Sequence, residues 1–236
     1  MSEGAAGTRQ AYLLAGPTAS GKSAIAAVLA REMGARILSA DSMLVYRGMD
    51  IGTAKPSRAE IEEFGMGGVD IVTPAEEFSS GAWLRSAAEW IARVPTDVPV
   101  VIVGGTGLYF SALLRGLDRK WVKPPPAYPV IRIERAEVRA RIAARLNDMY
   151  LDGLEAEKRK LHELYPVWSR TASLAIGYRE GDTREKIFVR TCQLAKRQDT
   201  WFRHQASPIY VEPTVDAVRA CWQAHGPWTV RFAAEG

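Results

Sequence analysis

The chain of 236 residues contains only two cysteines, Cys192 and Cys221, and their spacing matches neither a metal site nor a redox pair. This scarcity excludes a disulfide framework and indicates a reducing compartment. Long apolar runs are also missing. Residues 1–10 are polar, and the apolar stretch after them is too short for a signal sequence or a membrane span. We therefore expect a cytoplasmic protein that binds no membrane.

Neither sign of charge dominates, because 31 Lys and Arg face 27 Asp and Glu, which gives a net charge of +4. This mild surplus permits an anionic partner such as a polyphosphate or RNA, but a protein with an ordinary basic surface would carry the same net charge. The sequence has no internal repeat. Its length predicts a single domain over residues 1–236, with residues 1–10 as a disordered tail.

The clearest motif is GPTASGKS, Gly16–Ser23, which matches the phosphate-binding pattern G-x-x-x-x-G-K-[ST] at every specified position. An apolar strand predicted over 11–16 precedes it, and a helix predicted over 22–34 follows it. A second strand predicted over 35–41 completes a β-α-β unit. This order predicts an α/β fold of the P-loop NTPase-like type, in which helices flank a parallel sheet.

The rest of the chain continues the alternation of helices and strands. Residues 42–56 are rich in turn residues and predict a long loop over the site. The prolines within residues 118–130 interrupt the pattern and predict a crossover segment followed by extra C-terminal helices. We predict helices over 79–94, 108–117, 136–164, 183–203 and 216–224, and strands over 98–107, 130–135 and 207–213.

A glycine loop at the start of a helix presents backbone N–H groups to a bound oxyanion, and the helix dipole adds to the attraction. Lys22 is placed to reach the terminal phosphate. Ser23 is placed to ligate Mg2+ through its hydroxyl. The motif does not specify whether the ligand is a nucleoside triphosphate or a diphosphate.

Asp41 lies at the end of the second predicted strand, and ligands of open α/β sheets bind at this end of the strands. Asp41 is therefore either an acceptor-facing acid or a residue that caps the next turn through its side chain. The strand over 98–107 ends in glycines rather than in an acid. This absence argues against an NTP hydrolase, but a small-molecule kinase that uses Asp41 as its base stays open.

The helix predicted over 183–203 places Arg190, Leu194, Arg197 and Trp201 on one face, because they are spaced by three and four residues. Arginines among apolar side chains are costly to bury without a partner. A bound diphosphate would satisfy Arg190 and Arg197. The alternative is that both are surface arginines whose stems cover apolar neighbours.

Five segments now occur in order, namely GPTASGKS, SADSMLVYRGMDIGTAKP, VGGTGLYFSALLRGL, AIGYRE and QLAKRQDTWFR. Together they closely resemble the tRNA dimethylallyltransferase family, over residues 12–117 and again over 131–203. The resemblance implies a prenyltransferase that moves a dimethylallyl group from dimethylallyl diphosphate to N6 of an adenine beside the tRNA anticodon. In that case the glycine loop holds the diphosphate, Mg2+ is the cofactor and no ATP is consumed.

The resemblance also implies roles for individual residues. Asp41 matches the family's base toward the adenine amine, and Thr18, Lys22 and Ser23 match its diphosphate and metal contacts. Together with Mg2+ and Lys22, Arg197 would neutralise the departing charge. The predicted catalytic residues are Asp41, Thr18 and Arg197, and the predicted metal ligand is Ser23. The predicted diphosphate-binding residues are Gly16, Thr18, Ala19, Ser20, Gly21, Lys22, Ser23, Arg190 and Arg197. The predicted acceptor-binding residues are Asp41, Ser42, Met43, Leu44 and Thr106.

The sequence departs from the family after Leu117, where typical members carry a helical insertion that grips the anticodon stem and bears a QRL-type motif. Residues 118–130 pass straight across this point without a match to that motif, and Cys192 stands where the family has an arginine. The donor site is thus nearly intact, whereas the clamp on the tRNA is missing.

Because the clamp is missing, three acceptors stay open: tRNA, a free adenine nucleotide, and a small aromatic metabolite such as an indole. Two other classes of protein also remain. A P-loop small-molecule kinase would bind ATP and ignore dimethylallyl diphosphate. An RNA-binding relic would bind tRNA without turnover.

Overall fold

The computed structural model describes residues 9–115, 127–179, 181–205 and 207–230. Most of the tail predicted over 1–10 and most of the crossover predicted over 118–130 lie outside the described residues. At their described ends both predictions extend too far. Arg9 and Gln10 pair with the C-terminal strand, and residues 128–130 belong to a strand of the main sheet.

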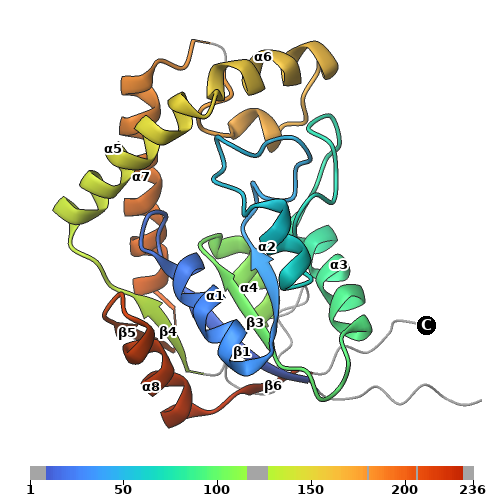
Figure 1. Ribbon diagram of the computed structural model, residues 1–236, viewed down its shortest axis with the longest axis vertical. Helices are drawn as coiled ribbons and strands as arrows, with labels where there is room; N and C mark the ends of the chain where they lie inside the picture. Colours follow the sequence, from blue (N-terminus) through green and yellow to red (C-terminus); the bar gives the residue numbers. More distant parts are fainter. Residues whose placement is uncertain (1–8, 116–126, 180, 206, 231–236) are drawn as a thin grey trace, which may run out of the picture.

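Five parallel strands form the main sheet in the order β2-β3-β1-β4-β5, as predicted for a P-loop NTPase-like α/β fold (Figure 1). Their bounds are Arg9–Ala15 for β1, Arg36–Ala40 for β2, Val100–Gly104 for β3, Tyr128–Ile131 for β4 and Pro208–Val211 for β5. The register aligns Ala15 with Gly104 and Gly104 with Ala40. The segments that follow β1, β2 and β3 therefore leave the sheet along the same edge.

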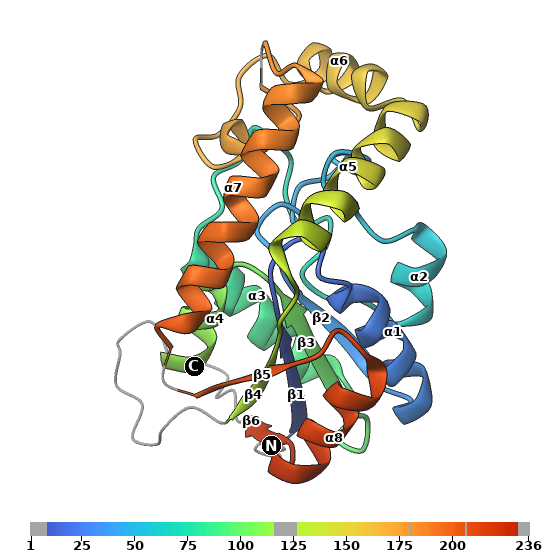
Figure 2. The ribbon, with the colours of Figure 1, turned by 90° about the vertical axis from the view of Figure 1, so that its left-hand side faces the viewer.

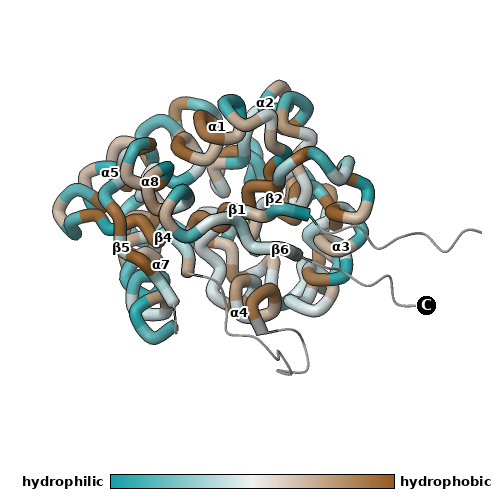
Figure 3. The backbone as a smooth tube through the Cα atoms, turned by 90° about the horizontal axis from the view of Figure 1, so that it is seen from below, coloured by the Kyte–Doolittle hydropathy of each residue, from teal (hydrophilic) through white to brown (hydrophobic). Residues whose placement is uncertain are grey.

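Two pairs of helices cover the two faces of this sheet (Figure 3). Helices α1 (Lys22–Met33) and α8 (Val215–His225) lie on one face, and α3 (Ser80–Arg93) and α4 (Gly107–Arg115) lie on the other. Successive residues of β1 point to opposite sides, so Leu13 packs in the cluster with α3 and α4, and Leu14 in the cluster with α1 and α8. Both faces are buried, which explains why the strands consist of nearly continuous apolar runs.

Three long helices and one short one form an arm beyond the carboxyl ends of the strands (Figure 2). This helical arm consists of α5 (Arg135–Leu151), α6 (Leu154–Leu164), the short 3-10 helix η1 (Ala172–Leu174) and α7 (Arg184–Arg203). Val138 and Ile142 of α5 pack against Ala195 of α7. No helix in the described part of the chain is long and apolar enough to cross a membrane.

Several elements differ from the predictions in extent. The helix predicted over 136–164 is two helices, because Gly153 adopts a left-handed conformation with φ of 98° between α5 and α6. The sequence analysis also missed α2 (Arg58–Glu63) and β6 (Trp228–Val230), which runs antiparallel to the start of β1. Both are too short to show the spacing of apolar residues that is typical of a helix or a strand. A capping box formed by Ser57 and Glu60 nevertheless marks the start of α2.

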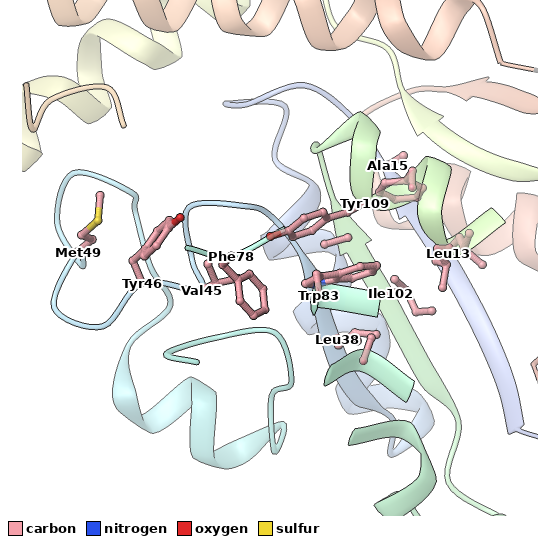
Figure 4. Close-up of a cluster of buried hydrophobic side chains, with 14 of the residues drawn as sticks. Leu13, Ala15, Leu38, Val45, Tyr46, Met49, Phe78, Trp83, Ile102 and Tyr109 are labelled. Atoms are coloured by element: carbon pink, nitrogen blue, oxygen red, sulfur yellow. The ribbon is translucent and has the colours of Figure 1, made fainter. Parts of the chain in front are cut away.

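The predicted loop after β2 is present and connects the sheet to the helical arm. Figure 4 shows Val45, Tyr46 and Met49 following one another along this loop, away from Ile102 and Trp83 at the sheet. All five side chains are buried. The loop is therefore anchored by buried side chains at three points, which helps to fix the position of Asp41 at its start.

Candidate functional site

The glycine loop lies between β1 and α1, as predicted, and is contacted by both long helices of the arm. The N–H of Thr18 donates to Oε1 of Gln198 on α7 over 2.8 Å, and Nη2 of Arg145 on α5 donates to Oγ1 of Thr18 over 2.7 Å. Lys22 curls back over the loop, with Nζ 3.2 Å from the carbonyl oxygen of Pro17. Three groups that bind anions, namely Lys22, Arg145 and the N-terminus of α1, thus meet at one point.

The other predicted loop residues lie around this point. Ala19 packs against the apolar contact between α5 and α7, and Ser20 is completely buried. Ser23 is exposed in the first turn of α1. The described residues contain no group of three or more His, Cys, Asp or Glu that would hold a metal without a substrate.

Asp41 directly follows β2, and its Oδ1 accepts a hydrogen bond from the N–H of Met43 over 2.9 Å. The turn-capping alternative is therefore correct. Asp41 also lines the cavity described below, so capping and an acceptor-facing position are compatible. Next to it, Oγ1 of Thr106 accepts from the N–H of Ser42 over 3.0 Å, which ties the segment after β2 to the segment after β3.

A cavity of about 520 Å³ separates these strand ends from the helical arm. Its walls include four of the predicted acceptor-binding residues, Asp41, Ser42, Met43 and Thr106, together with Thr18 of the glycine loop. Leu44 does not line it. The opposite wall carries the apolar side chains Ile142, Leu146, Met149 and Leu194 of α5 and α7. The sequence had not indicated which apolar residues would surround a prenyl tail.

The electrostatics of this cavity favour an anion. Burial lowers the pKa of Lys22 to about 8; the Asp41 carboxylate acts in the opposite direction, and the Arg145 guanidinium lowers this pKa further. Burial also lowers the pKa of Arg145, and Asp41 again opposes the shift. Two cations therefore share one carboxylate in a poorly solvated place, which is the arrangement that a bound polyanion would stabilise.

Arg190 and Arg197 both line the cavity, together with Leu194 on the same face of α7. The premise that both arginines lack a partner is wrong for Arg190, because its guanidinium forms an ion pair with the buried carboxylate of Asp182. Arg197 is exposed. Trp201 does not line the cavity and packs against Gly107 instead.

Arg145 was missed by the sequence analysis, although the same argument would have found it. It lies on α5 three residues after Ile142 and four before Met149, within an apolar stripe that faces the cavity. The charged composition of α5 as a whole concealed this one inward position. For Gln198, no feature of the sequence indicated a place in the site.

Two family models match the chain. The model described as IPP transferase matches residues 44–133 and 120–205, and the model described as isopentenyl transferase matches residues 9–65. The chain belongs to the IPP transferase family. The resemblance found in the sequence is thus confirmed, and the two parts of the first match meet where the crossover is predicted.

Known proteins agree with this assignment. The chain is 42% identical over 167 residues to a tRNA dimethylallyltransferase of Myxococcus xanthus, and the match covers 70% of this chain and 50% of that protein. It is 30% identical to a tRNA dimethylallyltransferase of Acidithiobacillus ferrooxidans, with 87% and 91% covered. That alignment runs over 287 positions, more than the 236 residues of this chain. The chain spans about half the length of the Myxococcus protein and of a second curated relative.

The fold also has solved counterparts. A crystal structure of a tRNA isopentenylpyrophosphate transferase from Bacillus halodurans superposes with a TM-score of 0.78 at 24% identity, covering 92% of this chain and 94% of that one. At this identity the likeness establishes the fold.

Proposed function

We propose that this protein transfers a dimethylallyl group from dimethylallyl diphosphate to N6 of an adenine in tRNA. The observation that carries the proposal is the meeting of cations with an acid at the strand ends: Arg145, Thr18 and Asp41 line the cavity. The ammonium of Lys22 lies close enough to interact with both Asp41 and Arg145. One side is built for a polyphosphate leaving group and the other for a group that loses a proton. The names of the relatives support the acceptor, since each matched relative described above is named for tRNA.

The donor would bind with its diphosphate on the glycine loop. Backbone N–H groups at the start of α1 would meet the phosphate oxygens, and Lys22 and Arg145 would neutralise them. Arg145 already holds the hydroxyl of Thr18, so these two groups stand together beside the oxygen that departs with the diphosphate. Arg197, exposed on the cavity wall, is placed to add a further positive charge.

Mg2+ fits this donor site as a companion of the diphosphate. The exposed hydroxyl of Ser23 in the first turn of α1 is a hard oxygen ligand, and phosphate oxygens would complete the shell. When bound, Mg2+ neutralises part of the charge that develops on the leaving group.

In the transfer step, groups on one side of the cavity would receive the leaving group, and a group on the other side would receive the proton. The bond between the allylic carbon and the diphosphate oxygen breaks, and the diphosphate departs with the electron pair. The N6 lone pair forms the new carbon–nitrogen bond. Asp41 accepts the N6 proton, which returns electron density to a nitrogen whose lone pair is otherwise delocalised into the ring.

Water has to be kept from the electron-deficient allylic carbon, because it would consume the donor by hydrolysis. Ile142, Leu146 and Met149 of α5 form an apolar wall opposite Asp41 and suit a five-carbon tail.

The experiment that tests the proposal offers the protein dimethylallyl diphosphate and Mg2+ together with tRNA, AMP, ATP or indole in parallel. We expect a gain of one five-carbon unit on an adenosine of the tRNA, detected by mass spectrometry of the digested nucleosides. Transfer to AMP or indole alone would replace the acceptor. Transfer of a phosphate from ATP would instead identify a kinase.

A further inference from the structure

The carboxylate of Glu157 on α6 is held by three consecutive backbone N–H groups of the loop after β2. Asp50 donates over 3.2 Å, Ile51 over 2.9 Å and Gly52 over 3.4 Å. Consecutive N–H groups that converge on one point form an anion-binding concavity. Here the anion is a side chain of the same protein, so Glu157 fixes the path of the loop at these residues.

Tyr178 completes this arrangement. Its hydroxyl donates to Oε1 of Glu157 over 2.5 Å and accepts from the N–H of Gly52 over 2.9 Å. The tyrosine is buried, and a Cβ on Gly52 would come within 2.6 Å of its ring, so only glycine permits this approach. Burial, and next the Glu157 carboxylate, raise the pKa of Tyr178 far above its usual range, so the hydroxyl stays a donor.

These contacts lie directly behind the wall of the reaction cavity. Gly52 and Thr53 line the cavity, and so do Ile176 and Arg179, which flank Tyr178 in the chain. The hydrogen bonds of Glu157 and Tyr178 join the loop of residues 41–57 to the helical arm. The sheet side carries Asp41, whereas the arm carries Arg145.

A second set of contacts stabilises the loop internally. The role of Glu157 in attaching the loop to the arm can therefore be distinguished from a role in shaping the loop. The buried ammonium of Lys55 pairs with Asp50 and Asp70, each over 2.6 Å, and donates to the carbonyl oxygen of Tyr46. These contacts hold the loop to itself and do not reach the arm. Losing Glu157 or Tyr178 would therefore loosen one attachment of the loop to the arm, while the loop keeps its own shape and its apolar contacts with Leu161.

We propose that Glu157 and Tyr178 are positioning residues that set the separation between Asp41 on the sheet side and Arg145 on the arm. They touch neither donor nor acceptor. They hold the part of the cavity wall formed by Gly52 and Thr53, against which the acceptor would lie. Their loss therefore changes kcat/KM for the acceptor more than the affinity for the donor. The kinetic part of this inference rests on the proposed function, whereas the structural part does not.

The structural part is tested by hydrogen exchange of the whole protein without substrates. In Glu157→Gln, we expect the amides of residues 50–52 to exchange at least about tenfold faster than in the wild type, because their charged acceptor becomes a neutral amide oxygen. In Tyr178→Phe, we expect the same of Gly52, which loses the tyrosine oxygen as an acceptor. Peptides from β1 and α1 should exchange as before. Glu155→Gln on the same helix is the matched control, since its side chain is exposed and makes no contact with the loop. Unchanged exchange at residues 50–52 in both variants would overturn the proposal.

The kinetic part uses dimethylallyl diphosphate and tRNA. We expect kcat/KM for tRNA to fall about 10- to 100-fold in Tyr178→Phe, while the dissociation constant of dimethylallyl diphosphate changes less than about twofold. A merely structural role would reduce the folded fraction and leave KM for tRNA unchanged, which would also overturn the proposal. If the wild type transfers no five-carbon unit, the proposed function fails, and the exchange result still decides whether the pair positions the loop.

Discussion

At the scale of the residue, Asp41 caps a turn and is proposed to accept a proton, and one substitution separates these two roles. Its Oδ1 caps the turn through the N–H of Met43. Asparagine keeps this acceptor but does not take up a proton. We predict that Asp41→Asn leaves the thermal midpoint of unfolding unchanged and lowers the single-turnover rate of transfer at least about 100-fold. A near-normal rate would show that another group accepts the N6 proton.

Lys22 gives the donor site a pH dependence. Since its pKa is about 8 in the free protein, the charge that attracts the diphosphate is complete below that pH and is lost as the pH rises through it. We predict that the affinity for dimethylallyl diphosphate, measured by calorimetry without acceptor, declines by up to about tenfold per pH unit above this value. Lys22→Arg, which stays charged, should give a flatter profile, and identical profiles for the two proteins would contradict the assignment.

Arg145 is predicted to act on the leaving group through its place beside Thr18. Arg145→Gln should lower kcat about 100- to 1000-fold, because a donor aimed at developing charge is lost. Arg139→Gln is the matched control, since Arg139 lies on the same helix but stacks on Phe188 outside the reaction cavity. Equal effects of the two substitutions would contradict a specific role.

The residues also mark what the sequence was able to predict. A contiguous motif identified the glycine loop and Lys22, and a strand end identified Asp41, because both depend on local order. The partner of Arg190 was not predicted, since Asp182 precedes the first turn of α7 and helical spacing says nothing about the direction of its side chain. Arg145 was predictable in principle from its place in an apolar stripe, but no local motif accompanies it.

At the scale of the element, α7 is anchored by one ion pair to the turn that precedes it. The carboxylate of Asp182 is 1% exposed, accepts from the N–H of Gly177 over 3.1 Å and pairs with Arg190. We predict that Arg190→Met, which leaves this carboxylate without its cation, lowers the free energy of unfolding by about 3 kcal/mol in urea denaturation. The double variant with Asp182→Asn should recover part of the loss. If Arg190→Met is neutral, its guanidinium is available for the diphosphate as first predicted.

Helices longer than two turns and the strands of the parallel sheet were predictable, whereas α2, η1 and β6 were not. Helices α1, α3 and α7 begin and end within a few residues of their predicted bounds, because their apolar spacing continues over several turns. Gly153 does not look like a break in the sequence, since glycine also occurs inside helices. Its left-handed conformation separates α5 from α6, which places Glu157 against the loop after β2.

At the scale of the whole molecule, the parallel sheet and the family followed from the sequence, whereas the cavity did not. The cavity forms between two separately built parts, the sheet edge and the helical arm, and no spacing within one segment encodes the distance between them. The helical insertion that this chain is predicted to lack falls on residues 118–130, most of which lie outside the described residues. Its absence therefore stays a prediction.

This prediction has a measurable consequence for tRNA. Each neutralised phosphate adds to the steepness with which binding weakens in salt. We predict that log KM for tRNA rises less steeply between about 50 and about 200 mM salt for this chain than for the Myxococcus relative, of which the chain spans half. An equal slope would mean that this protein holds as many phosphates without an insertion.

The glycine loop is synthesised long before the residues that contact it. Gln198 lies 180 residues after Thr18, and Arg145 lies 127 residues after it. At about 5–20 residues per second, a ribosome needs roughly 10 to 35 seconds to pass from Thr18 to Gln198. A chain that ends before α5 carries the glycine loop but lacks Arg145, Gln198 and the apolar wall of the cavity. The two sides of the cavity therefore come together only after α7 has been made.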